Sequence, residues 1–154
     1  MGGPRYSMKI VPDTSVVIDG RITNIVRRKE PGAAEVIVPE AVVAELEAQA
    51  DRGQETGYKG LEELGELAQL ADSGTITLRY VGQRPTLEDI KLAGGGAIDA
   101  AIRSVAEEED ATLITSDWIQ ARVAEAKRIP VEYLRPKTKG RRRTPALLKY
   151  FEPD

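Results

Sequence analysis

The chain has 154 residues, a length that suits one domain with its own hydrophobic core, and 41% of these residues are hydrophobic and 31% charged. It contains no Cys and no His, which excludes disulfides, thiolate zinc sites, thiol nucleophiles and every catalytic triad that needs histidine. The net charge is −3. No apolar run is long enough to span a bilayer, so we expect no membrane partner.

Charge is unevenly distributed along the chain. The segment 135–143, "RPKTKGRRR", carries six basic residues and no acid, which leaves a net charge of −9 for the rest. We expect a domain over residues 8–134, a basic linker and the start of a following segment over 135–154, and a short extension over 1–7. The N-terminus shows no signal-peptide hydrophobic region, so we expect a cytoplasmic protein.

The first half of the chain alternates between strand and helix patterns. "MKIVP" (8–12) predicts a buried strand, and Ser15 is the expected cap of a helix that reaches about Arg28 with an interruption at Asp19 and Gly20. "EVIVP" (35–39) predicts a second strand. The segment 40–50 then has apolar residues at helical spacing.

The second half continues the alternation. Helical patterns over 60–74 and 94–110 flank a strand over 75–81 and a short helix over 86–90. The remaining elements, in chain order, are a strand over 111–115, a helix over 116–128 and a strand over 129–134. This alternation with short connections predicts an α/β domain built on a mostly parallel sheet.

Four acids fall where a site would form in such a fold. Asp13 and Asp117 directly follow strands, and sites in open α/β sheets lie at the carboxyl ends of strands. Asp99 is expected in the first turn of a helix that opens at Ala97, and Glu45 at the margin of a buried helix face. Carboxylates gathered at one edge repel each other unless cations lie among them, which indicates an oxygen-lined site for Mg²⁺, Mn²⁺ or Ca²⁺.

Each acid also has an ordinary structural interpretation. About one residue in six is acidic, so a single Asp13 is most often a turn or cap residue, and a single Asp99 a helix-terminal acid. The hydroxyls of Thr14 and Thr115 could orient metal ligands or a bound water.

The order of these segments resembles the PIN domain of nucleases. "VPDTSVVIDG", "VPEAVVAEL" and "GAIDAAIRSVAEEEDATLITSDW" carry the resemblance over about residues 8–134. The matching positions are Asp13 with Thr14 and Ser15, Glu45 before Leu46, Asp99, and Thr115 and Asp117 in the Thr-x-Asp pattern. The resemblance implies a three-layer α/β/α fold with a central, mostly parallel sheet.

The resemblance also implies a chemistry and a substrate. Asp13, Glu45, Asp99 and Asp117 would be catalytic and would hold one or two Mg²⁺ or Mn²⁺ ions, with Thr14, Ser15 and Thr115 behind them. The substrate would be nucleic acid, expected to be single-stranded RNA. The candidate phosphate-binding residues are Arg21, Arg103, Arg122, Arg141, Arg142 and Arg143.

Two further features have competing interpretations. Trp118 beside Asp117 is a candidate platform for stacking a base, or else a packing residue. The basic run at 135–143 is either a nucleic-acid contact or a solvated linker.

The opening "DTSVVIDGRI" is most similar to the PIN domain that precedes a P-loop ATPase and a KH module in longer archaeal proteins. The chain itself contains no G-x-x-x-x-G-K-[ST] motif, so we expect one domain of a larger protein that does not hydrolyse ATP by itself.

Two other functions compete with a metal-dependent endoribonuclease. One is a non-catalytic PIN module that binds nucleic acid or assembles subunits, including as a homo-oligomer. Another is a phosphoryl-accepting domain with Asp13 as nucleophile, although "DTS" lacks a second Asp two residues later. A toxin of a toxin–antitoxin pair is a narrower form of the nuclease hypothesis.

Overall fold

A five-stranded sheet with the order β3-β2-β1-β4-β5 forms the centre of the molecule, and all four strand pairs are parallel. The computed structural model describes residues 8–136, and at residues 87 and 90–95 it describes the backbone alone. The strands are β1 (Met8–Pro12), β2 (Ala34–Pro39), β3 (Ile76–Val81), β4 (Thr112–Thr115) and β5 (Val131–Tyr133).

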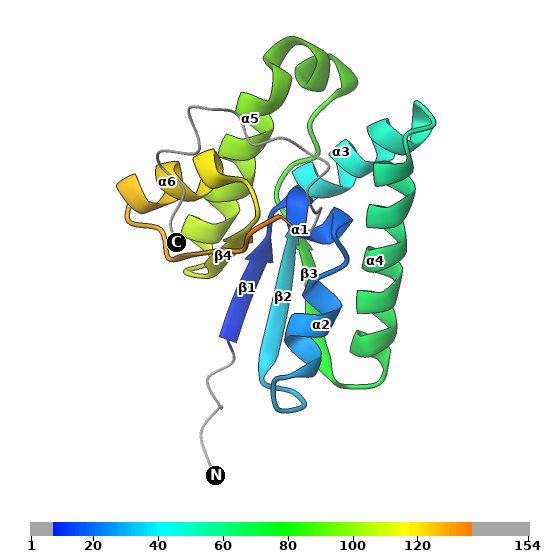
Figure 1. Cartoon of the computed structure of the whole chain (residues 1–154), viewed down its shortest axis with the longest axis vertical. Helices are drawn as coiled ribbons and strands as arrows, with labels where there is room; N and C mark the ends of the chain where they lie inside the picture. Colours follow the sequence, from blue (N-terminus) through cyan, green and yellow to red (C-terminus); the bar gives the residue numbers. More distant parts are fainter. Residues whose placement is uncertain (1–7, 137–154) are drawn as a thin grey trace.

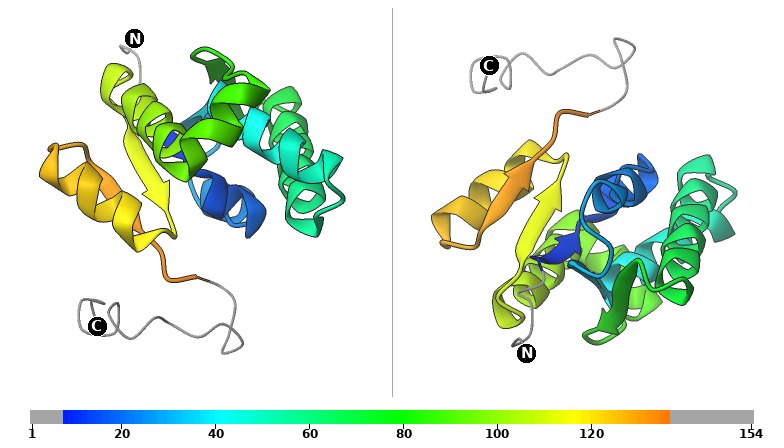
Figure 2. Two further views of the ribbon diagram at one scale, coloured as in Figure 1. Left: turned by 90° about the horizontal axis from the view of Figure 1, so that it is seen from above. Right: turned by 90° about the horizontal axis from the view of Figure 1, so that it is seen from below.

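Helices connect these strands within residues 8–136. They are α1 (Thr14–Ile18), α2 (Ile22–Arg27), α3 (Glu40–Asp51), α4 (Glu55–Asp72), α5 (Leu87–Glu108) and α6 (Trp118–Ala126). Helices α1, α2 and α4 cover one face of the sheet and α5 and α6 the other, as Figure 2 shows from above and below. The chain passes from β1 through β2 to β3 and then crosses back over the sheet to β4. Because parallel strands are joined by right-handed crossovers, connections that run in opposite directions along the sheet place their helices on opposite faces.

The expected three-layer α/β/α architecture is therefore confirmed, with a sheet that is parallel throughout. The three central strands are buried in the core, and Ile10, Val36 and Leu113 have no exposed surface. Helix α3 lies near the carboxyl ends of the strands, where it contacts α1, α4 and α5 (Figure 1). This end of the sheet is where α1 and α6 also begin.

The first expected helix is two short helices. Gly20 adopts a left-handed φ of 68° between α1 and α2, a conformation that favours glycine and ends α1. The expectation that Ser15 caps a helix is wrong, because α1 begins at Thr14 and Asp13 occupies the N-cap position.

Helix α5 is one continuous helix, whereas the sequence pattern predicts two separate helices over 86–90 and 94–110. A capping box between Thr86 and Asp89 starts the helix, which then continues through the glycines that were expected to precede a new helix. Asp99 consequently lies in the interior of α5, and the expectation of a first-turn position is wrong. A glycine run is tolerated inside a helix when capping and packing outweigh the propensity cost of about 1 kcal/mol per glycine.

Helices α3 and α4 pack at short distance because α4 presents glycines to α3. Helix α4 begins at Glu55 rather than at residue 60, and this added turn brings Gly57 against the backbone of α3. A Cβ atom on Gly57 would lie 2.3 Å from the amide nitrogen of Ala50. The contact fixes α3, the helix that carries Glu45.

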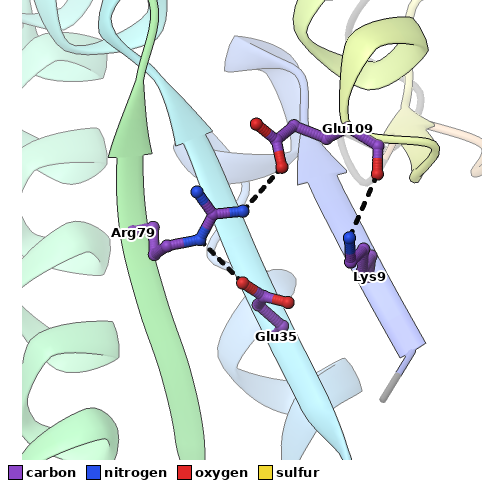
Figure 3. A network of polar contacts seen from close by, with 4 residues as sticks. All are labelled: Lys9, Glu35, Arg79 and Glu109. Carbon is purple, nitrogen blue, oxygen red and sulfur yellow. Dashed lines mark hydrogen bonds and ion pairs between the residues drawn. The ribbon is translucent and has the colours of Figure 1, made fainter. Parts of the chain in front are cut away.

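A polar network secures the C-terminal end of α5 against the sheet (Figure 3). Arg79 on β3 donates to Glu35 on β2 at 2.7 Å and to Glu109, the C-cap residue of α5, at 2.6 Å. Lys9 on β1 donates to the backbone carbonyl of Glu109 at 3.3 Å. Three strands thereby hold one end of the helix on which Asp99 lies.

None of the helices within residues 8–136 combines the length and the apolarity that crossing a bilayer requires.

We expect Gly57→Ala to lower the free energy of unfolding by about 1–3 kcal/mol, the usual range for overpacking, because the added methyl group meets backbone that cannot rotate away. Gly65→Ala is the matched control, since it lies in the same helix with nothing within 4 Å of its Cβ position and should raise stability by about 0.5–1 kcal/mol. Urea unfolding measures both, and equal effects of the two substitutions would contradict the close helix contact.

Candidate functional site

Asp13 is a buried carboxylate at the carboxyl end of β1. The residue is 3% exposed, and its backbone N–H donates to the carbonyl of Ile114 at 2.9 Å, which ties the start of α1 to β4. Although Asp13 holds the N-cap position of α1, its carboxylate makes no capping hydrogen bond. The ordinary interpretation of Asp13 as a cap therefore does not account for its side chain.

Hydroxyl groups from two elements hold the Asp13 carboxylate. Its Oδ2 atom accepts hydrogen bonds from Thr115 at 2.7 Å and from Ser15 at 3.2 Å. Thr115 has no exposed surface, and its Oγ1 also accepts from the backbone N–H of Asp117 at 2.9 Å. One threonine therefore connects the acids that follow β1 and β4.

Glu45 joins the site from α3. Its Oε1 accepts a hydrogen bond of 2.6 Å from Thr14, the first residue of α1. Burial of Glu45, followed by the negative charge of Asp13, raises the pKa of the Glu45 carboxyl above its usual value, although the Thr14 bond opposes the shift.

Asp117 lies at the N-cap of α6 and does act as a cap. Its Oδ1 atom accepts from the backbone N–H groups of Ile119 at 3.0 Å and Gln120 at 3.2 Å. Asp117 follows β4, as expected. Its Oδ1 atom also has the ordinary structural role of a helix cap.

Asp99 contributes from the interior of α5, where its residue is partly buried. Burial raises the pKa of Asp99 to about 7, with further contributions from the negative charges of Asp13, Asp117 and Glu45. The positive charge of Arg103 acts in the opposite direction. The other three acids are thus near enough for their charges to act on Asp99.

The four acids do not form a preassembled ligand set. Within residues 8–136, no group of three or more carboxylates is already arranged to hold a metal ion. Their chemistry nevertheless fits a hard divalent cation, because the donors are carboxylate oxygens and their mutual repulsion is what a cation would relieve. Among the buried polar atoms of the described side chains, the hydroxyl of Ser116, between Thr115 and Asp117, also lacks a hydrogen-bond partner.

Gln120 is a site residue that sequence reasoning missed. It is 1% exposed, and its Nε2 donates to Asp13 Oδ1 at 3.3 Å and to the backbone carbonyl of Asp99 at 3.2 Å. Its Oε1 accepts a 2.6 Å hydrogen bond from Arg103. Its position three residues after Asp117 was the available signal, but a glutamine in a helix has no spacing pattern that marks it as a site residue.

The arginines expected to bind nucleic acid have different surroundings. Arg103 is engaged by Gln120, and Arg21 at the N-cap of α2 donates to the backbone carbonyl of Arg135. Arg122 lies 5.4 Å from the centre of the Trp118 ring and forms an exposed ion pair with Glu125. The expected contacts at Arg141, Arg142 and Arg143 lie outside the described residues.

Comparisons with known proteins agree with this architecture. A solved domain of a functionally unknown protein from Methanocaldococcus jannaschii DSM 2661 superposes with a TM-score of 0.79 at 47% identity, covering 90% of this chain and 99% of that one. A curated relative from the same species, described as an uncharacterized KH and PIN-domain containing protein, is 52% identical over 126 residues. That match covers 82% of this chain, which spans about a fifth of the relative's length.

A family model of the PIN domain matches residues 10–126. The family consists in general of nucleases that use divalent metals, and the matched range contains Asp13, Glu45, Asp99 and Asp117. On the strength of this match and of the shared fold, the chain belongs to the PIN domain family.

Proposed function

We propose that this PIN domain is a divalent-metal-dependent endoribonuclease that hydrolyses phosphodiester bonds of single-stranded RNA. The observation that carries the proposal is the gathering of four acids, in which the charges of Asp13, Glu45 and Asp117 all act on Asp99. Shared hydrogen bonds also connect them, because Thr115 bonds to Asp13 and to the Asp117 backbone, and Gln120 bonds to Asp13 and to the Asp99 backbone. Such a gathering costs stability unless a cation occupies it, and the helix cap that Asp117 provides does not account for the other three acids.

The ligands in this proposal are Asp13, Asp99 and Asp117, and Glu45 contacts a second ion or a water. When bound, Mg²⁺ or Mn²⁺ would lower the pKa of an attacking water and stabilise charge on the phosphate oxygens. Thr115 and Ser15 keep the Asp13 carboxylate in one orientation, and Thr14 does the same for Glu45. No histidine is required, which agrees with a chain that has none.

A site made of four acids requires basic groups around it to hold RNA. The candidates are Arg21, Arg122 and the basic residues 141–143, and Trp118 next to Asp117 is a candidate for stacking an unpaired base. The relative's name includes a KH domain, a module that recognises single-stranded nucleic acid, and this favours RNA as the substrate. We propose that the domain works as part of such a longer protein, in the cytoplasm.

A non-catalytic PIN module is the second candidate. The observation that favours it is that no three acids within residues 8–136 are prearranged around an ion. Such a module would bind nucleic acid or assemble subunits without cleaving RNA.

Asp99→Asn should abolish cleavage of a single-stranded RNA oligonucleotide in Mn²⁺, with a loss of at least about 100-fold, because an amide is a poorer ligand and carries no charge. Asp51→Asn, at the exposed C-terminal end of α3, is the matched control and should cleave like the parent. Cleavage by Asp99→Asn at the parental rate, with circular dichroism showing both variants folded, would refute the catalytic assignment.

The raised pKa values of the buried acids determine how the stability of the fold changes with pH. Native Asp99 holds its proton up to a pKa of about 7 whereas the unfolded chain releases it near 3.8, so the free energy of unfolding falls as pH rises between these values. The raised pKa values of Asp13 and Glu45 act in the same direction.

Asp99→Asn should therefore raise the Tm at pH 8 by about 2–4 °C for each kcal/mol that burial and repulsion of the Asp99 charge cost the parent. Added Mn²⁺ should raise the Tm of the parent and leave that of the variant nearly unchanged. Thermal unfolding followed by circular dichroism at pH 4 and pH 8 measures both effects. A lower Tm of Asp99→Asn than of the parent at pH 8 would contradict the view that the charge of Asp99 destabilises the fold.

The single tryptophan offers a test of RNA binding that is independent of cleavage. If bases stack on Trp118, a single-stranded oligonucleotide added to Asp99→Asn in EDTA should quench its fluorescence, and a duplex of the same sequence should quench it less. An abasic oligonucleotide is the control for charge alone. Equal quenching by the abasic and base-containing strands would exclude stacking.

A further inference from the structure

The orientation of the Gln120 amide is determined by its neighbours. Arg103 has only N–H donors, so the atom that it contacts at 2.6 Å must be the carbonyl oxygen of Gln120. Both N–H groups of Gln120 are then available for Asp13 Oδ1 and for the backbone carbonyl of Asp99, at 3.3 and 3.2 Å. Every polar atom of this buried side chain is thus committed to the candidate site.

The same amide connects a cation to a buried carboxylate. The partners that hold Asp13 are the hydroxyls of Thr115 and Ser15 and the amide of Gln120, which are all neutral. Arg103 polarises the amide through a charge-assisted bond, and hydrogen bonds in series strengthen one another. A guanidinium paired directly with Asp13 would instead occupy the carboxylate and repel an incoming cation.

Gln120 also joins three elements. It lies on α6, reaches Arg103 and the Asp99 carbonyl on α5, and bonds to Asp13 at the end of β1. Since Asp99 is in the interior of α5, its position relative to Asp13 depends on how α5 packs against β1. The Gln120 side chain fixes that relation inside the site itself.

We propose that Gln120, oriented by Arg103, is a positioning residue that holds Asp13 and the Asp99 segment of α5 in the arrangement that binds the divalent ion. The inference rests on the proposed metal-dependent function. It reassigns Arg103 from contact with RNA to support of the site, acting through Gln120 on the ligands.

The test is Mn²⁺ affinity without RNA, measured on the full chain from the electron paramagnetic resonance signal of free Mn²⁺. Gln120→Leu and Arg103→Met should each raise the Kd by about 10-fold, the lower end of the range for groups that support metal ligands. The double variant should lose clearly less affinity than the two single effects combined, because the arginine acts mainly through the glutamine and only in part through its charge on Asp99. Arg103→Lys, which keeps a donor and a charge, should recover most of the affinity.

Thr23→Val is the matched control for loss of a buried polar contact. Thr23 is 3% exposed and donates at 3.2 Å to Glu63, away from the four acids, so its substitution should destabilise the fold without changing the Kd for Mn²⁺. A Kd shift in this control equal to that in Gln120→Leu would overturn the inference.

A measurement on the unaltered chain covers the case in which Gln120→Leu fails to fold. Addition of Mg²⁺ should shift the side-chain amide resonances of Gln120 in a ¹⁵N–¹H spectrum more than those of Gln69, an exposed residue of α4. Equal shifts would overturn the inference.

The outcomes separate this inference from the function on which it rests. If the parent binds no Mn²⁺, the proposed metal-dependent function fails and the inference fails with it. If the parent binds Mn²⁺ and Gln120→Leu binds it equally well, the inference alone is wrong. Additive effects of Gln120→Leu and Arg103→Met would show that the arginine does not act through the glutamine.

Discussion

The carboxylate of Asp13, buried at the end of the central strand and held by neutral donors, is the constraint on which the site depends. Burial is the largest cause of its raised pKa, and the hydrogen bonds from Thr115 and Gln120 oppose that shift. Asp117 and Asp99 add negative charge around it. The fold thus maintains an electrostatically unfavourable arrangement, which is characteristic of a functional site rather than of a stabilising one.

The scaffold is rigid where the acids require it to be. Parallel pairing of β1 with β4 brings the residues after both strands to one edge, and the bond from Asp13 to Ile114 fixes that register. Close packing at Gly57 sets the position of α3, and the network around Arg79 anchors the end of α5. Each acid is therefore carried by an element whose position is set by contacts outside the site.

Features of the fold and of the candidate site that depend on local sequence pattern can be predicted from the sequence. The positions of Asp13 and Asp117 at the carboxyl ends of β1 and β4 follow from the sequence, because an acid directly after a buried strand has a fixed place in a parallel sheet. The predicted first-turn position of Asp99 is wrong. The helix propensity of the glycine run alone indicates a break, but the capping box at Thr86 starts the helix earlier and the helix continues through the glycines. Gln120 was missed because its role depends on contacts with α5 and β1, which are distant in sequence.

The central claim is that the four acids become a metal site when a cation is present. Its most direct test is a crystal of the protein soaked in Mn²⁺, with data collected at a wavelength where manganese scatters anomalously. The account predicts an anomalous peak bounded by the carboxylates of Asp13, Asp99 and Asp117, at oxygen distances of about 2.0–2.3 Å, the range for small hard cations. A map at saturating Mn²⁺ with no peak among these carboxylates would contradict it.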